Sequence, residues 1–286
     1  MSPPRKISGY NVLSHIGEGA HSDIYAVQDP KTKQVWALKH IEINDEKEQR
    51  FFEQARREYT IGSKLSHPGI RQLRKFIRHR KRFKVVGASL VMEFIDSTTL
   101  DQQLPRTIPE AVGIFIQVAE ALAHMHEKGY VHADIKPTNV LLMEDGIVKV
   151  IDLGQACATG TVKKRIQGTP GYMAPEQAQR QAIDARTDIF NFGAMMYWVL
   201  AREVIPTAMP PAGGDAALMT TRDLEQIAAP TPPHEVDSRI PEALSQLVLH
   251  CVAKDADDRP GSMMEVITAL NQLQTNDRQK MSTASG

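Results

Sequence analysis

The densest group of polar residues in the sequence is the stretch His132-Ala-Asp134-Ile-Lys136-Pro-Thr-Asn139. Lys136 follows Asp134 by two residues, and Asn139 follows it by five. A carboxylate can orient a hydroxyl and accept its proton, an ammonium can offset developing negative charge, and an amide oxygen can bind a metal ion. These residue types at this spacing favour the transfer of a phosphoryl group to a hydroxyl.

A further acid, Asp152, follows the strand-like run Val148–Ile151. Mg²⁺ binds proteins through one or two carboxylates and completes its coordination with phosphate oxygens. Asp152 and Asn139 are therefore candidate magnesium ligands.

Two charged residues in the first third of the chain are expected to point inward. Lys39 shares a strand face with apolar neighbours, and Glu58 interrupts an otherwise apolar helical stripe. Each is costly to bury alone, so pairing satisfies both. Taken by themselves, these two residues fit a purely structural ion pair equally well.

A glycine-containing stretch, Gly17-Glu-Gly19-Ala-His-Ser22, joins two predicted strands. Glycines let a backbone approach a phosphate closely and offer its N–H groups. An ordinary hairpin turn explains the stretch equally well. Because no helix follows it, the stretch does not fit a dinucleotide-binding turn.

Hydrophobic periodicity predicts the elements that position these residues. Residues 7–41 alternate as strands, 45–65 follow helical spacing along Phe51, Ala55, Glu58, Gly62 and Leu65, and β-type runs continue to residue 94. From about residue 98 the pattern is mainly helical, with a capping-box spacing at Thr107–Glu110 and an almost wholly apolar helix at 188–200. The β-rich start and helical remainder predict two lobes, with a polar, disordered tail at 274–286.

In this order, the motifs resemble those of a eukaryotic-type (Hanks-type) serine/threonine protein kinase. The glycine-rich stretch, Ala37-Leu-Lys39, Glu58, the 132–139 loop, Asp152-Leu-Gly154 and Gly168–Glu176 all come in register over about residues 9–273. The resemblance implies a two-lobed α+β fold. Its N-lobe would span about 9–93, its hinge 93–97 and its C-lobe 98–273.

The resemblance also implies ATP and Mg²⁺ as ligands and assigns roles to residues. Asp134, Lys136, Lys39 and Glu58 would be catalytic, and Asn139 and Asp152 would hold the metal. The ATP-binding residues would be Ile16, Gly17, Gly19, Ser22, Ile24, Ala37, Lys39, Met92, Glu93, Ile95 and Leu141. Of these, Met92 would be the gatekeeper, and the backbones of Glu93 and Ile95 would contact adenine.

Lys136 and the pair Gly168-Thr169 resemble serine/threonine kinases more than tyrosine kinases. The resemblance therefore implies protein substrates with Ser or Thr hydroxyls, autophosphorylation, and a role for Thr169 in positioning Asp134 and Lys136. It also implies that Arg259 pairs with Glu176.

Three residues depart from the family pattern: Ser22 for a glycine, Leu153 for a phenylalanine and Ala133 for an arginine. That arginine commonly pairs with a phosphorylated activation-loop residue. We therefore expect activity to depend little on phosphorylation at Thr159 or Thr161, the nearest candidate sites. Ala133 and Ser22 leave a second interpretation, a pseudokinase that binds nucleotide as a scaffold.

Composition bounds the remaining choices. The 34 Lys and Arg balance 34 Asp and Glu, two cysteines fit a reducing compartment, and no apolar run reaches the length that spans a bilayer. We expect a cytoplasmic protein without a transmembrane segment and with no nucleic-acid partner. One stretch, 71–84, holds eight Lys or Arg and no acid. It fits either a solvated charged hairpin or a docking site for an acidic partner, nucleic acid or an anionic surface.

Overall fold

The computed structural model describes residues 5–19, 21–43, 45, 48–206 and 227–284, with side chains described as far as residue 275. The chain forms two compact units. Unit 1 comprises Met1–Ser66, Ile70–Asp96 and Asp152–Gly154, and unit 2 comprises His67–Gly69, Ser97–Ile151 and Gln155–Gly286. The division after Asp96 falls within the predicted hinge. Asp152–Gly154, which the sequence placed in the second lobe, groups with unit 1.

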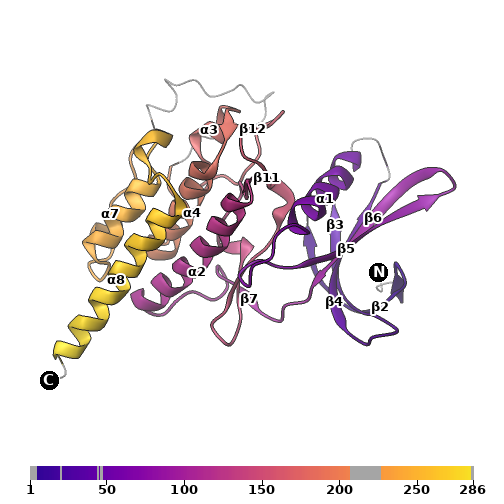
Figure 1. The fold of residues 1–286 in the computed structure, drawn as a ribbon, viewed down its shortest axis with the longest axis horizontal. Helices are drawn as coiled ribbons and strands as arrows, with labels where there is room; N and C mark the ends of the chain where they lie inside the picture. The colour runs from indigo at the N-terminus through magenta and orange to yellow at the C-terminus, as the bar shows by residue number, and fades with distance from the viewer. Residues whose placement is uncertain (1–4, 20, 44, 46–47, 207–226, 285–286) are drawn as a thin grey trace. The chain divides into compact units, whose positions relative to one another are not determined.

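An antiparallel sheet forms most of unit 1 (Figure 1). Its strand order is β1-β2-β3-β4-β6-β5. The strands are β1 Lys6–Ile7, β2 Tyr10–Gly19, β3 Ser22–Gln28, β4 Val35–Glu42, β5 Leu73–Lys81 and β6 Lys84–Glu93. Helix α1, Gln49–Gly62, packs against β4, β5 and β6. The predicted strands, the helix and the two later β-type runs are all present.

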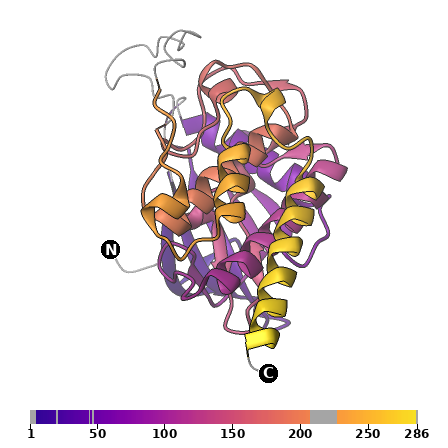
Figure 2. The same cartoon turned by 90° about the vertical axis from the view of Figure 1, so that its left-hand side faces the viewer.

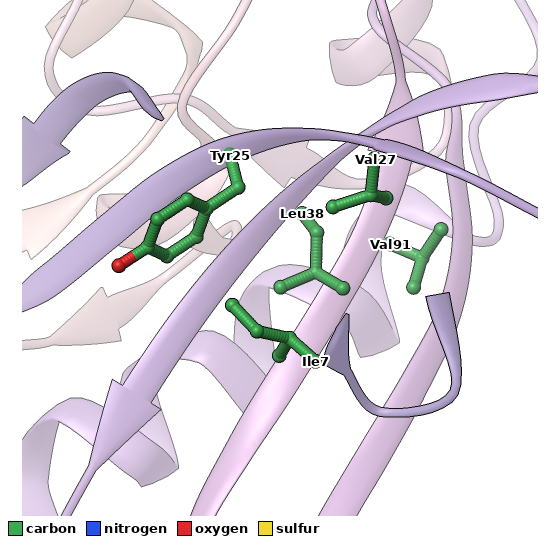
Figure 3. Packing of buried hydrophobic residues seen from close by; sticks show 5 residues of the cluster. All are labelled: Ile7, Tyr25, Val27, Leu38 and Val91. Atoms are coloured by element: carbon green, nitrogen blue, oxygen red, sulfur yellow. The ribbon is translucent and has the colours of Figure 1, made fainter. Parts of the chain in front are cut away.

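Strand β4 has two buried faces with different roles. Leu38 lies opposite Tyr25 on β3 and Val91 on β6. With Ile7 and Val27, these side chains form an apolar cluster (Figure 3). Because successive side chains of a strand alternate between faces, Lys39 points to the other face, where α1 packs. The apolar cluster therefore fixes the orientation of the lysine.

The inward stripe of α1 is shifted by one residue at its start from the predicted one. Phe52 is buried, whereas Phe51 is half-buried and stacks on His21. The shift follows from packing, because Phe52 makes an edge contact with Phe76 of β5. Glu58 is buried, as predicted.

Helices form most of unit 2 (Figure 2). They are α2 Ile108–Glu127, α3 Pro175–Ala178, α4 Ala185–Ala201, α6 Pro233–Val236, α7 Glu242–Cys251 and α8 Met263–Ala284. Helix α2 begins at the predicted cap, where the Glu110 amide donates to Thr107 Oγ1 over 3.2 Å. Helix α4 is buried along nearly its whole length, as the apolar sequence predicted.

Short strands in unit 2 pair with one another and so hold the loops beside them in place. β9 Val140–Leu142 pairs with β10 Val148–Val150 and with β7 Thr98–Thr99. β11 Cys157–Ala158 pairs with β8 Tyr130–Val131, and β12 Thr161–Val162 pairs with β13 Ala182–Ile183. These pairings fix the loops that carry the polar residues of the 132–139 stretch.

Among the described residues, one helix, α2, is long and apolar enough to cross a membrane by length and composition alone. This is weak support for a span, because α2 packs against α4 and α8 and 56% of its most apolar window is buried. The core helix of a folded domain satisfies the same criteria.

Helix α8 continues to Ala284, past the predicted end of the packed domain at 273. It runs along α2 (Figures 1 and 2). The sequence predicted a disordered tail because residues 274–286 are polar, but polarity does not prevent α-helix formation when Gln, Arg and Lys supply good helix propensity.

Candidate active site

Lys39, Glu58 and Asp152 lie together in unit 1. Lys39 Nζ is 3.0 Å from Glu58 Oε2 and 3.8 Å from Asp152 Oδ1. Burial alone would lower the pKa of Lys39, but attraction from Glu58 and then Asp152 outweighs it and raises that pKa. The ammonium therefore stays charged and is available to a phosphate group.

Several predicted ATP-binding residues share the face of the sheet that carries Lys39. Ile24 lies directly opposite Lys39, and Ala37 lies directly opposite Met92. Ala37 and Lys39 are two residues apart on β4, so both rows lie on one face. This arrangement places apolar surface beside a charged lysine, as a nucleotide base and its phosphates require.

The glycine-rich stretch forms the ends of β2 and β3. Gly17 pairs with Ile24 and Gly19 pairs with Ser22. A Cβ at Gly19 would lie 2.7 Å from Ser22 Oγ, so any larger residue there would displace the serine hydroxyl. Ser22 is 8% exposed, and its hydroxyl has no hydrogen-bond partner among the described residues. A buried, unpartnered hydroxyl in this position fits a phosphate oxygen of a bound nucleotide.

The predicted adenine contacts lie at the end of β6. The Glu93 amide donates to Gln72 O over 2.9 Å, so this N–H is already used within unit 1. The Ile95 amide has no hydrogen-bond partner among the described residues. Ile16 of β2 is 47% exposed.

Leu141 does not lie with these residues in unit 1. It is buried on β9 of unit 2, so the predicted ATP contacts are distributed over both units.

Asp134, Lys136 and Thr169 form a closed hydrogen-bonded triangle in unit 2. Lys136 Nζ is 3.2 Å from Asp134 Oδ2 and donates to Thr169 Oγ1 over 2.7 Å. Thr169 in turn donates to Asp134 Oδ1 over 2.8 Å. Asp134 is largely buried. The predicted contacts of Thr169 with the loop acid and lysine are present.

Asp188 of α4 holds the backbone of the 132–139 loop through hydrogen bonds. The carboxylate accepts from the amides of His132 and Ala133, each over 2.8 Å, and contacts His126 Nε2 over 2.8 Å. Burial alone would raise the pKa of Asp188, but its contacts with His126 and His132 hold it below the ordinary value. Asp188 therefore stays ionised and fixes the loop.

The His132 ring also fixes the loop. Its Nδ1 accepts from the Asp134 amide over 3.3 Å, so the proton is on Nε2, which faces Ile151 O at 3.1 Å. Ala133, at the position of the family's arginine, has a φ of +61° and is fully buried. That backbone conformation costs about 1–2 kcal/mol in an alanine, so the surrounding contacts must hold it.

The two candidate metal ligands differ in their surroundings. Asn139 Nδ2 donates to Asp134 O over 2.9 Å, which orients the amide oxygen away from that carbonyl. Asp152 has a 46% exposed side chain, and its Oδ1 accepts from the Gly154 amide over 3.3 Å. One amide oxygen and one accessible carboxylate are the hard oxygen donors that Mg²⁺ uses. The residues fit the predicted metal.

Sequence reasoning missed Gln177. This glutamine is 3% exposed and its Nε2 donates to Ala133 O over 2.8 Å and to Gln167 O over 3.3 Å. Its Oε1 accepts from the Ala174 amide and from Asn191 Nδ2, each over 2.9 Å. One side chain thus joins the 132–139 loop to α4 and to the activation segment, which runs from Asp152 to Glu176. Its position directly after Ala174-Pro-Glu176, the end of the kinase-like stretch 168–176, is the only signal in the sequence, and that signal identifies no partner.

The activation segment is held by backbone pairing as well. Cys157 pairs with Val131, Thr161 pairs with Ile183, and Gly160 donates to Ile183 O over 2.7 Å. Thr159 is exposed, whereas Thr161 Oγ1 donates to Ala158 O over 2.6 Å.

At the far end of the segment, Glu176 receives two parallel bonds from Arg259, over 2.8 and 2.9 Å. The predicted pair is therefore present. The Thr187 hydroxyl donates to the same carboxylate over 2.8 Å. Two side chains from distant parts of the chain thus fix the end of the activation segment.

Comparisons with known proteins agree with this geometry. The family model described as protein kinase domain matches residues 10–271. A probable serine/threonine-protein kinase of Streptomyces coelicolor is 30% identical over 278 residues, which cover 93% of this chain and 40% of that protein. A serine/threonine-protein kinase of Myxococcus xanthus is 30% identical over 296 residues, with 96% and 51% covered. The serine/threonine-protein kinase PrkC of Bacillus subtilis is 28% identical over 261 residues, with 88% and 38% covered. The chain spans about half or less of the length of these relatives.

Proposed function

Because the chain belongs to the protein kinase domain family, we propose that it transfers the γ-phosphoryl group of ATP to Ser or Thr hydroxyls of protein substrates, with Mg²⁺. The observation that carries this proposal is the triangle of Asp134, Lys136 and Thr169. It holds a carboxylate beside an ammonium and a hydroxyl in a buried loop. The names of the relatives support the choice of Ser and Thr as acceptors.

Asp134 would orient the acceptor hydroxyl and take its proton as the new bond to phosphorus forms. Lys136 would offset the negative charge that develops on the phosphoryl oxygens, and Thr169 would keep both side chains in place. Most of the rate would then come from positioning and electrostatic stabilisation, since phosphoryl transfer needs little covalent participation by the protein.

Residues of unit 1 would contact the phosphates and the adenine of ATP. Lys39, held by Glu58, would contact the α- and β-phosphates, and Ser22 Oγ and the glycine-rich backbone would contact phosphate oxygens. The Ile95 amide would donate to adenine. Mg²⁺, held by Asn139 and Asp152, would neutralise phosphate charge when bound.

Phosphate incorporation into a generic basic protein with Mg²⁺ and ATP tests this proposal. The wild-type chain is compared with Asp134→Asn, which keeps the size of the side chain but cannot accept the proton. The proposal predicts a fall of about 100-fold or more in the variant, the usual contribution of a general base. Equal, background-level incorporation by both proteins would favour the pseudokinase scaffold instead. Mass spectrometry of the same samples would locate autophosphorylation, expected at the exposed Thr159.

We also propose a cytoplasmic site of action, which the cysteines support. Cys157 and Cys251 are both buried and lie outside any disulfide. Burial raises the pKa of the Cys251 thiol to about 12, so it stays protonated and unreactive. Free thiols persist in reducing compartments. Fractionation of cells that express the chain tests this location.

A further inference from the structure

Four cationic residues and one aromatic residue form the tip of the hairpin that β5 and β6 make. This hairpin tip consists of Arg80, Lys81, Arg82, Phe83 and Lys84. Lys81 pairs with Lys84, so a two-residue turn closes the hairpin. Figure 1 shows the hairpin extending beyond the other strands of its sheet. The proposed catalytic function does not use these residues.

Three features of the hairpin tip oppose folding. Phe83 is fully exposed, although an aromatic side chain is stabilising when buried. Lys81 and Lys84 place like charges directly opposite each other. Arg82 has a φ of +56°, a conformation that favours glycine. Conflicts of this kind between local sequence and fold are expected at functional sites.

The cations of the hairpin surround its apex. Arg80 and Lys81 are consecutive on β5, so they point to opposite faces of the hairpin. Within the described part of the chain, none of Arg78, Arg80, Lys81, Arg82 and Lys84 forms an ion pair. The hairpin tip therefore concentrates positive field, although the net charge of the chain is zero.

Arg71, the first cation of the 71–84 stretch, does not belong to this surface. Its Nη1 contacts Met92 Sδ at 3.8 Å, and burial lowers the pKa of the guanidinium, opposed by Glu58. The basic stretch thus divides into one inward arginine and an exposed set further along β5 and in the turn.

We propose that the hairpin tip docks onto an anionic lipid membrane surface. Phe83 would enter the headgroup region, and the surrounding cations would pair with the anionic headgroups. An aromatic residue combined with Lys and Arg is the composition that binds membrane interfaces. This proposal does not depend on the proposed kinase activity.

The geometry favours a membrane over the other anionic partners. The aromatic residue lies at the apex of the hairpin with cations around it. On a flat surface the aromatic ring can therefore insert while the cations contact the surface around it. Proteins that bind single-stranded nucleic acid instead present aromatic side chains along a basic groove, where bases stack. An acidic protein would need an apolar pocket shaped for Phe83, whereas a bilayer interface accepts the ring without one.

Co-sedimentation of the full chain with vesicles tests this proposal. We compare phosphatidylcholine vesicles with vesicles that also contain phosphatidylserine, and expect binding to the second only. Each cation removed should weaken binding about fivefold, so Arg80→Gln with Arg82→Gln should weaken it about 25-fold. Phe83→Ala should weaken it about tenfold, because apolar burial is lost. Added salt should weaken the wild type more than the Arg80→Gln, Arg82→Gln variant.

The matched control is Lys31→Gln with Lys33→Gln. These two exposed lysines lie in the turn between β3 and β4 of the same sheet. The control should bind vesicles like the wild type, and all variants should keep the wild-type unfolding temperature within a few degrees or exceed it. Equal binding to neutral and anionic vesicles would overturn the proposal, as would an equal loss in the control. Tighter binding to single-stranded RNA or to polyglutamate than to phosphatidylserine vesicles would assign the hairpin tip to another partner.

Discussion

Lys39 keeps its charge in a nearly buried position because two carboxylates lie close to it. Its side chain is 17% exposed and that of Glu58 only 3%. A buried ion pair contributes little net stability, yet removing one member leaves the other charge without compensation. The effect of this ion pair on stability can therefore be measured separately from its effect on catalysis.

Lys39→Met should destabilise the chain by about 3 kcal/mol, because Glu58 is left buried without its counterion. Adding Glu58→Leu should recover most of this loss while phosphate transfer stays absent. Urea unfolding of the single and double variants measures both effects. A double variant no more stable than Lys39→Met would contradict the argument.

The same variant has a defined pH dependence. Burial raises the pKa of Glu58 above 4.5, and Lys39 opposes that rise. Without Lys39 the pKa of Glu58 rises further, so the folded state binds the proton more tightly than the unfolded state. Stability then falls as pH rises from about 4.5 through the raised folded pKa. The loss of unfolding free energy in Lys39→Met, relative to the wild type, should therefore be larger at neutral pH than near pH 4.5.

Gln177 positions the catalytic loop through its two donated and two accepted hydrogen bonds. Gln177→Leu would leave Ala133 O and the Ala174 amide buried without partners, at about 1–3 kcal/mol for each group. We expect kcat to fall about tenfold, with KM for ATP nearly unchanged, because Gln177 contacts no predicted ATP-binding residue.

The control for this change is Gln181→Leu, an exposed glutamine four residues further along. It should leave kcat unchanged. Steady-state kinetics over a range of ATP concentrations measures kcat and KM for ATP in both variants. A change in KM for ATP with constant kcat would show that Gln177 does not position the loop.

The residues that could be predicted from the sequence are those with a charge to satisfy. An inward Lys39 and Glu58 each demand a partner, so their pair was predictable. The roles of Asn139 and Asp152 as metal ligands stay predictions. Gln177 was not predictable, because a neutral amide demands no single counterion and its four partners come from three separate segments.

At the scale of elements, periodicity predicted the sheet and the main helices because most strands and helices bury one face. Periodicity gave the wrong prediction where tertiary contacts determine which side chain is buried. The burial of Phe52 in place of Phe51 depends on Phe76, which lies on a strand beyond the helix. The continuation of α8 to Ala284 depends on helix propensity in a segment whose polarity suggested disorder.

The β5–β6 hairpin gives an element-scale prediction. Arg82→Gly removes a left-handed arginine that costs about 1–2 kcal/mol, while glycine adds about 0.5–1 kcal/mol of unfolded-state entropy. The net result should be a gain of about 0.5–1 kcal/mol in unfolding free energy. Binding to phosphatidylserine vesicles should weaken about fivefold at the same time.

The comparison for this change is Lys33→Gly. Lys33 has a φ of +63° in the turn between β3 and β4, so it should gain similar stability without loss of vesicle binding. Thermal or urea unfolding measures the first quantity and co-sedimentation the second. If Arg82→Gly lowered stability, the strain assigned to the hairpin tip would be wrong.

At the scale of the whole molecule, net charge is a poor guide to partners. The sum is zero, but the cations of the β5–β6 hairpin are concentrated in one part of unit 1. A charged surface acts over about a Debye length, roughly 8 Å at physiological salt, so the local arrangement matters more than the sum. The sequence could reveal the basic stretch, but the exposed apex and the inward Arg71 required the structure.

Control of the whole chain is expected to differ from that of kinases switched by activation-loop phosphorylation. Ala133 offers no cation to a phosphate, and the segment is already held by β8 and β13, by Gln177 and by Arg259. A phosphate on Thr159 would add negative charge to the loop. Because position 133 is an alanine, it offers no cation that could pair with this phosphate and order the loop. Phosphatase-treated protein should therefore keep its rate within about twofold of the untreated protein, as should the Thr159→Ala variant, since neither change removes a contact that orders the loop. The initial rate of phosphate transfer to an exogenous protein measures this, with mass spectrometry verifying dephosphorylation. A loss of most of the rate on treatment would show that a cation other than one at position 133 reads the phosphate.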